Sequence, residues 1–164
     1  MTSKQSIKIL LTCILLLPTV AANAGDLREH QVDPAVTKIM GIPADASERD
    51  IIKALGKPKS VKESYNYLEE KPSRNLYYEE AKIYIVDDNI YGFSCFGLSC
   101  MTEKGIKVGD PRAKVVAVYG SGNPPYPESA RDTLSYPLTG RDIYLVFVFK
   151  EGKVAEIEFF MDFA

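Results

Sequence analysis

The chain has 164 residues, with 20 Lys or Arg against 22 Asp or Glu and a formal net charge of −2. This length suits one compact domain with a substantial core. The acidic balance argues against a nucleic-acid partner, because binding to phosphate backbones needs clustered positive charge. Beyond the amino terminus no apolar run approaches membrane-spanning length, so we expect a soluble mature protein with no transmembrane segment.

Residues 1–24 have the pattern of a secretory signal peptide. Lys4 and Lys8 form a positive head, residues 9–17 are apolar apart from Thr12, and Ala22-Asn23-Ala24 matches an A-x-A cleavage site. The apolar stretch is too short to span a bilayer. We therefore expect cleavage after Ala24 and export to the periplasm or beyond the cell. Removal of the two lysines leaves 18 basic and 22 acidic residues, a charge of −4.

The three cysteines divide between the signal peptide and the mature chain. A lipid anchor on Cys13 is the alternative to simple cleavage, but the residues that follow it are apolar and not a polar tether. Cys95 and Cys100 remain, and in an oxidising compartment they predict a disulfide that closes a small loop. Their spacing differs from a C-x-x-C redox motif. His30, the sole histidine, lies far away, so we expect neither a metal nor a cofactor.

A segment at residues 25–40 precedes the main domain and predicts a short helix. Asp33 would cap it, Pro34 would occupy its first turn, and Val36, Ile39 and Met40 would form its apolar side until Gly41 ends it.

The remainder shows an internal repeat with a period of 64 residues. Gly41-Ile42 and Gly105-Ile106 open the two copies, and Gly56 and Gly120 recur at the same spacing. We expect unit 1 at residues 41–100 and unit 2 at 101–164, together forming one compact domain. The first helix would start at Ser47 and the second at Asp110, and each would end at its glycine.

Three extended segments follow each predicted helix, and the last two of each set are joined by short polar turns. They are Leu76 to Tyr78, Lys82 to Val86 and Ile90 to Cys95 in unit 1, and Thr133 to Tyr136, Ile143 to Phe149 and Val154 to Met161 in unit 2. Lys57 to Asn75 and Ser121 to Asp132 are expected to be long loops. The predicted fold class is therefore α+β: two tandem helix-plus-three-stranded antiparallel meander units, with the helices on one face of the sheet.

The Gly-Ile opening, the capped helix and the closing Leu55-Gly56-Lys57-Pro58 resemble the SmpA/OmlA (BamE-like) family. Two such units in tandem look like the architecture of β-lactamase inhibitor proteins. The resemblance covers most of residues 41–161 and implies the fold and a protein-binding sheet face. BamE-like proteins are lipid-anchored single units, so a role in outer-membrane assembly does not transfer directly. No contact residue of the inhibitor matches a motif here.

Catalytic patterns are weak in this sequence. His30 lies in a polar terminal segment, and the adjacent acids at 69–70, 79–80 and 87–88 would point to opposite faces or into solvent. Gly120-Ser121-Gly122 follows a helix, whereas a phosphate cradle precedes one. We therefore expect a protein that is not an enzyme.

Strand alternation separates a buried face from an outward face that is rich in aromatic side chains. Such faces suit protein recognition, because each ring adds a large contact area with few rotatable bonds. The predicted protein-binding residues are Tyr84, Tyr144, Val146, Val148 and Phe160 on strands and Tyr65, Tyr67 and Tyr126 in the loops. The alternative is that the other unit's helix, the long loops or a homodimer covers this face.

These features lead to one main hypothesis and two alternatives. The main one is an exported non-enzymatic protein-binding module, an inhibitor or immunity factor against a secreted or periplasmic hydrolase. The alternatives are an envelope-associated scaffold that acts with outer-membrane assembly machinery and an unrecognised small hydrolase.

Overall fold

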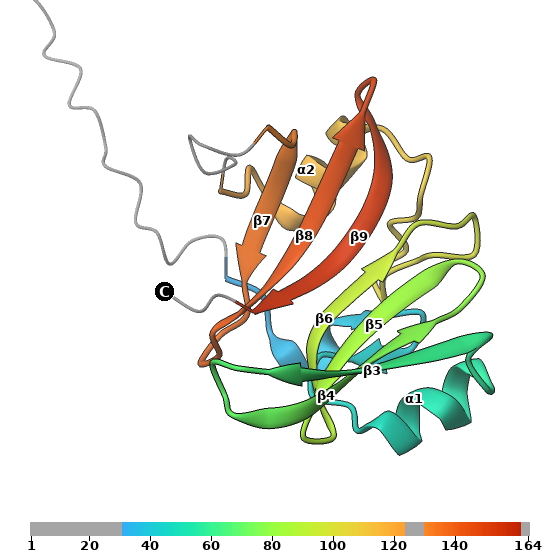
Figure 1. Ribbon diagram of the computed structural model, residues 1–164. Helices are drawn as coiled ribbons and strands as arrows, with labels where there is room; N and C mark the ends of the chain where they lie inside the picture. Colours follow the sequence, from blue (N-terminus) through green and yellow to red (C-terminus); the bar gives the residue numbers. More distant parts are fainter. Residues whose placement is uncertain (1–30, 124–129, 162–164) are drawn as a thin grey trace, which may run out of the picture.

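A seven-stranded antiparallel sheet dominates the computed structural model, which describes residues 31–123 and 130–161 (Figure 1). Its strand order is β3-β4-β5-β6-β9-β8-β7. The strands are β3 (Ser60–Asn66), β4 (Lys71–Tyr77), β5 (Ala81–Val86), β6 (Asn89–Cys95), β7 (Thr133–Pro137), β8 (Ile143–Lys150) and β9 (Lys153–Met161). The expected signal peptide, Cys13, His30 and Tyr126 lie outside the described residues.

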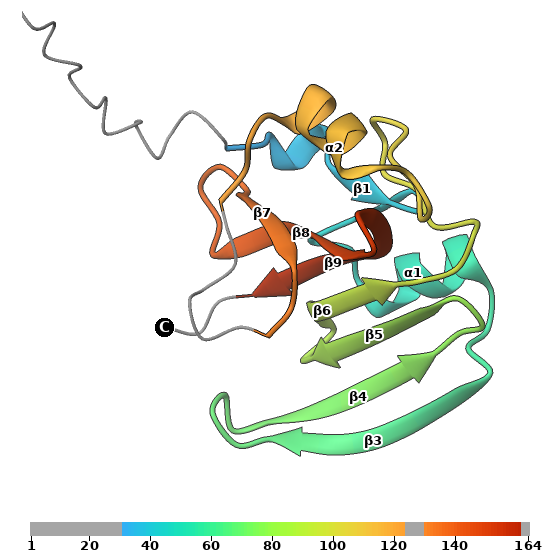
Figure 2. The same ribbon diagram turned by 90° about the horizontal axis from the view of Figure 1, so that it is seen from above.

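Two short helices and a small hairpin complete the fold. α1 (Glu48–Leu55) and α2 (Arg112–Tyr119) have eight residues each, and β1 (Lys38–Ile39) pairs with β2 (Ile42–Pro43) in a two-stranded sheet. Figure 2 shows the strands of the large sheet running from β3 at one edge to β7 at the other. Within the described residues, no helix has the length and apolar character that crossing a membrane requires.

The predicted fold class is wrong. The protein is mostly β: all the long strands join one continuous sheet, the predicted unit 1 supplies four of them, and the helices are short. The prediction counted the helices as major layers and treated Lys57 to Asn75 as a loop. That segment is the β3–β4 hairpin, whose β3 is exposed at every position except Asn66 and so lacks the apolar alternation that marks a half-buried strand.

A 64-residue spacing nevertheless recurs in the local geometry. The helices begin at 48 and 112 and end at 55 and 119. Register shifts interrupt the β5–β6 and β8–β9 pairs after residues 84 and 148. Isolated bridges join 47 to 89 and 111 to 153. The two helix–hairpin arrangements are therefore local equivalents within one sheet.

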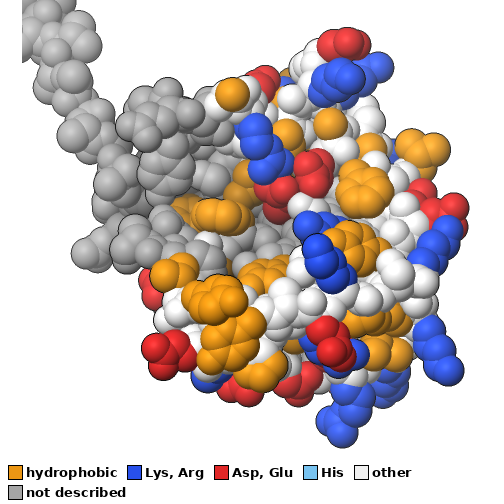
Figure 3. Space-filling model, viewed as in Figure 1, with side chains coloured by type: hydrophobic (Ala, Val, Ile, Leu, Met, Phe, Trp, Pro, Cys, Tyr) orange, Lys and Arg blue, Asp and Glu red, His pale blue; other side chains and the backbone are white. Residues whose placement is uncertain are grey.

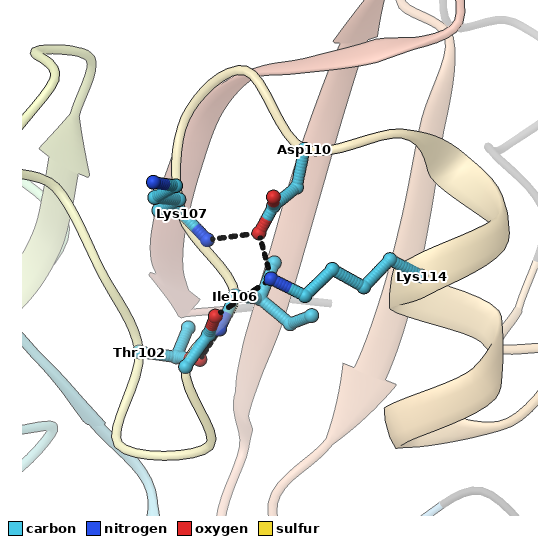
Figure 4. A network of polar contacts seen from close by, with 6 residues as sticks. Thr102, Ile106, Lys107, Asp110 and Lys114 are labelled. Atoms are coloured by element: carbon cyan, nitrogen blue, oxygen red, sulfur yellow. Dashed lines mark hydrogen bonds and ion pairs between the residues drawn. The ribbon is translucent and has the colours of Figure 1, made fainter.

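Each helix begins differently. Ser47 caps α1, as predicted, and its Oγ accepts a hydrogen bond from the Asp50 backbone N–H. Asp110 does not cap α2, which begins at Arg112 after Pro111. The Asp110 carboxylate accepts instead from the Lys107 N–H at 2.9 Å and the Lys114 Nζ at 2.7 Å (Figure 4). Burial acts to raise the pKa of Asp110, but these hydrogen bonds outweigh this effect and lower the pKa.

The amino-terminal helix is much shorter than predicted. Asp33 caps it, but it is a single 3-10 turn, η2 (Pro34–Val36). The chain then enters β1, and Met40 and Gly41 form the β1–β2 turn with positive φ values. Ile39 is buried as a strand residue, and Val36 is exposed.

One hydrophobic cluster lies between the large sheet and the elements that cover it. Ile83, Phe93 and Phe147 enter this cluster from the sheet, and Ile51 of α1 and Val115 of α2 enter it from the other side. Both helices thus contribute to the same hydrophobic cluster. The opposite face of the sheet has no helix over it within the described residues (Figures 1 and 2).

The predicted disulfide between Cys95 and Cys100 is present, with the Cα atoms 5.7 Å apart. The Glu80 carboxylate accepts hydrogen bonds from the backbone N–H groups of Leu98 and Ser99 and from the Ser99 hydroxyl. A Cβ atom at Gly97 would lie 2.0 Å from the Glu80 side chain, so only glycine fits there. The loop is therefore fixed both covalently and by Glu80.

Candidate protein-binding face

The face of the sheet away from the helices, here called the open face, carries the predicted strand residues. Its register places side chains of neighbouring strands side by side, so that one row runs Tyr84, Gly92, Phe160 and Tyr144. The open face is defined here by Lys82, Tyr84, Gly92, Ser94, Ser135, Tyr144, Val146, Val148, Glu156, Glu158 and Phe160. Figure 3 shows hydrophobic side chains gathered on this side of the molecule, with charged groups between them.

Gly92 leaves a hollow in the middle of the aromatic row. It lies between Tyr84 and Phe160 and has no side chain of its own. The hollow has a volume of about 180 Å³, and Phe160 beside it is 51% exposed. The ring of Tyr84 makes an edge-to-face contact with Tyr91, at 6.4 Å between ring centres. A partner side chain could therefore enter between rings of fixed position.

A charged network borders the hollow. Arg131 Nη2 donates to Glu158 Oε1 at 2.9 Å and to Glu156 Oε2 at 3.1 Å, and Ser94 Oγ donates to Glu158 Oε1 at 2.9 Å. Burial and the nearby charge of Glu158 raise the pKa of Glu156. Burial acts to lower the pKa of Arg131, but the hydrogen bond and the charge of Glu158 outweigh this effect and raise the pKa.

The structure separates the predicted binding residues into two groups. Tyr84, Tyr144 and Phe160 lie in one row on the open face, but neighbouring groups cover Val146, which is only 9% exposed. Val148 lies on the same face and is half-buried.

Of the predicted loop tyrosines, the two that the structure describes, Tyr65 and Tyr67, do not border this face. Tyr65 belongs to β3 and Tyr67 to the turn after it, and their rings contact each other at 5.2 Å. Tyr65 stands opposite Pro72 in the β3–β4 register, on the side of the sheet that faces the helices. The β3–β4 turn thus carries a separate aromatic pair.

Three residues of this region were missed by the sequence analysis. Arg131 was assigned to a long loop, yet it reaches across β9. Strand alternation alone did not assign Tyr91 to a face, because the register shift after Tyr84 changes the face on which its side chain lies. Lys82 was named only as a strand end, although it lines the hollow. Nothing in the local sequence around Arg131 pairs it with the two distant glutamates.

On this face, the Glu158 carboxylate accepts hydrogen bonds from both Ser94 and Arg131. Across residues 31–123 and 130–161, no group of three or more His, Cys, Asp or Glu side chains could hold a metal ion.

Comparisons with known proteins add little. No protein-family model and no curated protein matches the sequence. One solved structure, an extracellular protein containing a SCP domain from Bacillus anthracis, is similar with a TM-score of 0.49 and 8% identity over 72% of this chain and 44% of its own. The chain thus spans less than half the length of that protein.

A DUF4309 family protein (YjgB) from Bacillus subtilis is similar with a TM-score of 0.40 and 16% identity, over 71% of this chain and 78% of its own. Both TM-scores lie below 0.5, so neither likeness carries an inference about fold or function. The resemblance to the SmpA/OmlA family stays a prediction.

Proposed function

We propose that this is an exported, non-enzymatic protein-binding module whose open face contacts another protein. The carrying observation is the exposed Phe160 beside the hollow at Gly92, between Tyr84 and the Arg131 network. An exposed aromatic ring next to a preformed hollow is the arrangement that anchors protein–protein contacts, because it buries area without ordering a flexible chain.

Export is supported by the signal-like residues 1–24 and by the Cys95–Cys100 disulfide, a bond typical of oxidising compartments. The partner we propose is a secreted or periplasmic hydrolase, which the module would inhibit. Its contact site would supply an apolar side chain for the hollow and polar groups for Lys82 and the Arg131 network.

The test is affinity capture from envelope and secreted fractions of the producing cells, followed by binding and inhibition assays with the purified partner. Phe160→Ala and Tyr84→Ala should each weaken binding at least about tenfold, as expected for anchor residues. Leu98→Ala is the matched control, since Leu98 is 81% exposed but lies on the disulfide loop.

A hydrolase that forms a one-to-one complex and loses activity would support the proposal. Binding that survives both open-face substitutions would remove this face from the contact. A captured protein that shows no hydrolase activity would contradict the inhibitor assignment.

A further inference from the structure

Among residues 31–123 and 130–161, no strand pairs with the outer edge of β3. Pro72 of β4 has no N–H, and its carbonyl accepts from the Asp87 N–H on the far side of β4 from β3. The backbone polar groups of Pro72 therefore point towards β5. The backbone groups of Tyr65, which stands opposite Pro72 in the register, point away from β4. By the alternation of antiparallel pairs, Val61, Glu63 and Tyr65 all direct their N–H and C=O groups outward.

The other edge of the sheet is covered. Ser135 of β7 exchanges backbone hydrogen bonds with Asn123 at 2.8 and 3.1 Å, and the Val32 N–H donates to the Pro137 carbonyl at 3.0 Å. In the part of the chain that the structure describes, no such bridge reaches the outer side of β3. An edge of this kind is a template for pairing with another strand, although charged side chains such as Lys62 and Glu63 oppose unspecific pairing.

Two further features lie at opposite ends of β3. At its end, the turn into β4 exposes Tyr67 and Leu68 by 84% and 80%. At its start lies a pocket of about 440 Å³, lined by Met40, Leu55, Lys57, Lys59, Tyr78, Glu79, Glu80 and Ala81. Figure 2 shows β3 as the outermost strand, with this turn at one end and the connection from α1 at the other.

We propose that β3 pairs in antiparallel fashion with β3 of a second copy of this chain, with the two-fold axis at Glu63. This register places Val61 opposite Tyr65 of the second copy and satisfies all three pairs of outward backbone groups. A β-branched residue opposite an aromatic ring is a favourable cross-strand pair.

The same register explains both end features. Lys59 and Tyr67 lie four residues before and four residues after Glu63, where the two-fold axis passes. The register therefore sets Tyr67 of each copy opposite Lys59 of the other. Tyr67 contacts Tyr65 and so lies on the helix side of the sheet, where Met40 and Leu55 form the apolar part of the pocket. A second copy therefore supplies apolar side chains to a pocket that accepts them. An unrelated strand would fill the edge but not the two pockets symmetrically.

Charge sets the strength of this pairing. Glu63 of one copy meets Glu63 of the other on the axis, and like charges directly opposite weaken a strand pair. Arg74 stands beside Glu63 in the β3–β4 register, but its guanidinium is already paired with Glu48, so the repulsion between the two Glu63 carboxylates stays largely uncompensated. Pairing about an axis perpendicular to the sheet leaves both open faces on the same side, so the dimer is compatible with the proposed function without depending on it.

The test is sedimentation of the purified protein, expressed from the full-length sequence, over a range of concentrations. The wild type should show a monomer–dimer equilibrium. Glu63→Pro should abolish it, because proline removes the central outward N–H while that N–H takes no part in pairing with β4. Glu63→Gln should tighten it by about two- to fivefold, since the like-charge pair is lost. Leu98→Ala should leave it unchanged.

Two further measurements keep the proposal open to refutation if Glu63→Pro fails to fold. The paired substitution Tyr67→Ala with Leu68→Ala should weaken association roughly tenfold or more, because apolar burial is lost in both pockets. Amide exchange at Val61, Glu63 and Tyr65 should slow as protein concentration rises. A protein that stays monomeric, or a dimer indifferent to the β3 variants, would overturn the pairing.

Discussion

Tyr136→Phe removes one hydroxyl from the core and should cost a measurable part of the stability. Tyr136 is fully buried, and its hydroxyl donates to the Gly120 carbonyl at 2.9 Å, just after the end of α2. Burial also raises its pKa to about 12, so the hydroxyl stays protonated throughout the working range. The bond therefore ties the end of α2 to β7 under all ordinary conditions.

The magnitude follows from what the bond leaves behind. A net hydrogen bond contributes about 1 kcal/mol, and because Gly120 itself is exposed, water can reach its carbonyl, so we expect a cost of about 1 kcal/mol. For a domain of this size, this corresponds to a melting temperature about 2 to 4 °C lower. Tyr78 supplies the matched control, because its hydroxyl donates to the equivalent carbonyl of Gly56 at 3.2 Å in a more exposed setting.

Urea unfolding followed by circular dichroism measures both variants. Tyr78→Phe should cost no more than about 0.5 kcal/mol, since water can replace the exposed bond. The slope of unfolding free energy against urea should stay the same in both. Equal effects at the two sites, or no effect of Tyr136→Phe, would refute the argument that burial sets the strength of this link.

Three further predictions concern the disulfide and two carboxylates. Replacing both Cys95 and Cys100 by Ser should cost about 2 kcal/mol in urea unfolding, the loop-closure value for so short a ring; a loss that persists when both proteins are reduced would contradict this. Burial raises the pKa of Glu156, so its charged carboxylate destabilises the folded protein above the folded pKa. This destabilisation is lost as the pH falls through the folded pKa to the ordinary pKa of a glutamate. Glu156→Gln should therefore raise the melting temperature at pH 7 and not at pH 4. The hydrogen bond from Ser99 lowers the pKa of Glu80, so its stabilising effect is lost as pH falls through the folded pKa. Glu80→Gln should speed amide exchange in the 97–99 loop at neutral pH, with the difference from wild type shrinking in acid.

Local signals predicted the parts of the fold that local interactions determine. The Ser47 cap and Gly56 bound α1 because a side-chain acceptor and a positive-φ residue are both needed there. The polar turns at Asp87 and Glu151 bound the β5–β6 and β8–β9 hairpins, and both residues have positive φ. These features lie within a few residues of each other, so the sequence displays them directly.

Long-range pairing was not available from the same signals. β3 has exposed side chains on both faces, and only its hydrogen bonds to β4 make it a strand. The contact of Arg131 with Glu158 spans 27 positions, and the cover over Val146 depends on the register of several strands. Strand alternation identified which residues share the open face, but it does not report which of them a neighbour covers.

Positions 64 residues apart can be compared with each other, which separates residue types that folding requires from residue types that it does not determine. Equivalent buried positions keep their class: Ile83 corresponds to Phe147, Ile85 to Phe149, Ile90 to Val154 and Phe93 to Ile157, all within the core cluster. Several equivalent open-face positions change class: Lys82 corresponds to Val146, Gly92 to Glu156 and Ser94 to Glu158. Others do not, since Tyr84 and Val148 are both hydrophobic and Phe160 corresponds to Phe96.

Packing on the helices explains the first set, because a polar group there would be buried without a partner. The same backbone supports either member of each open-face pair, so folding alone does not select them. The hollow at Gly92 and the carboxylates that hold Arg131 arise because the two equivalent units differ at these positions. The fold alone therefore does not account for the residues of the open face, as expected if the proposed partner contact selects them.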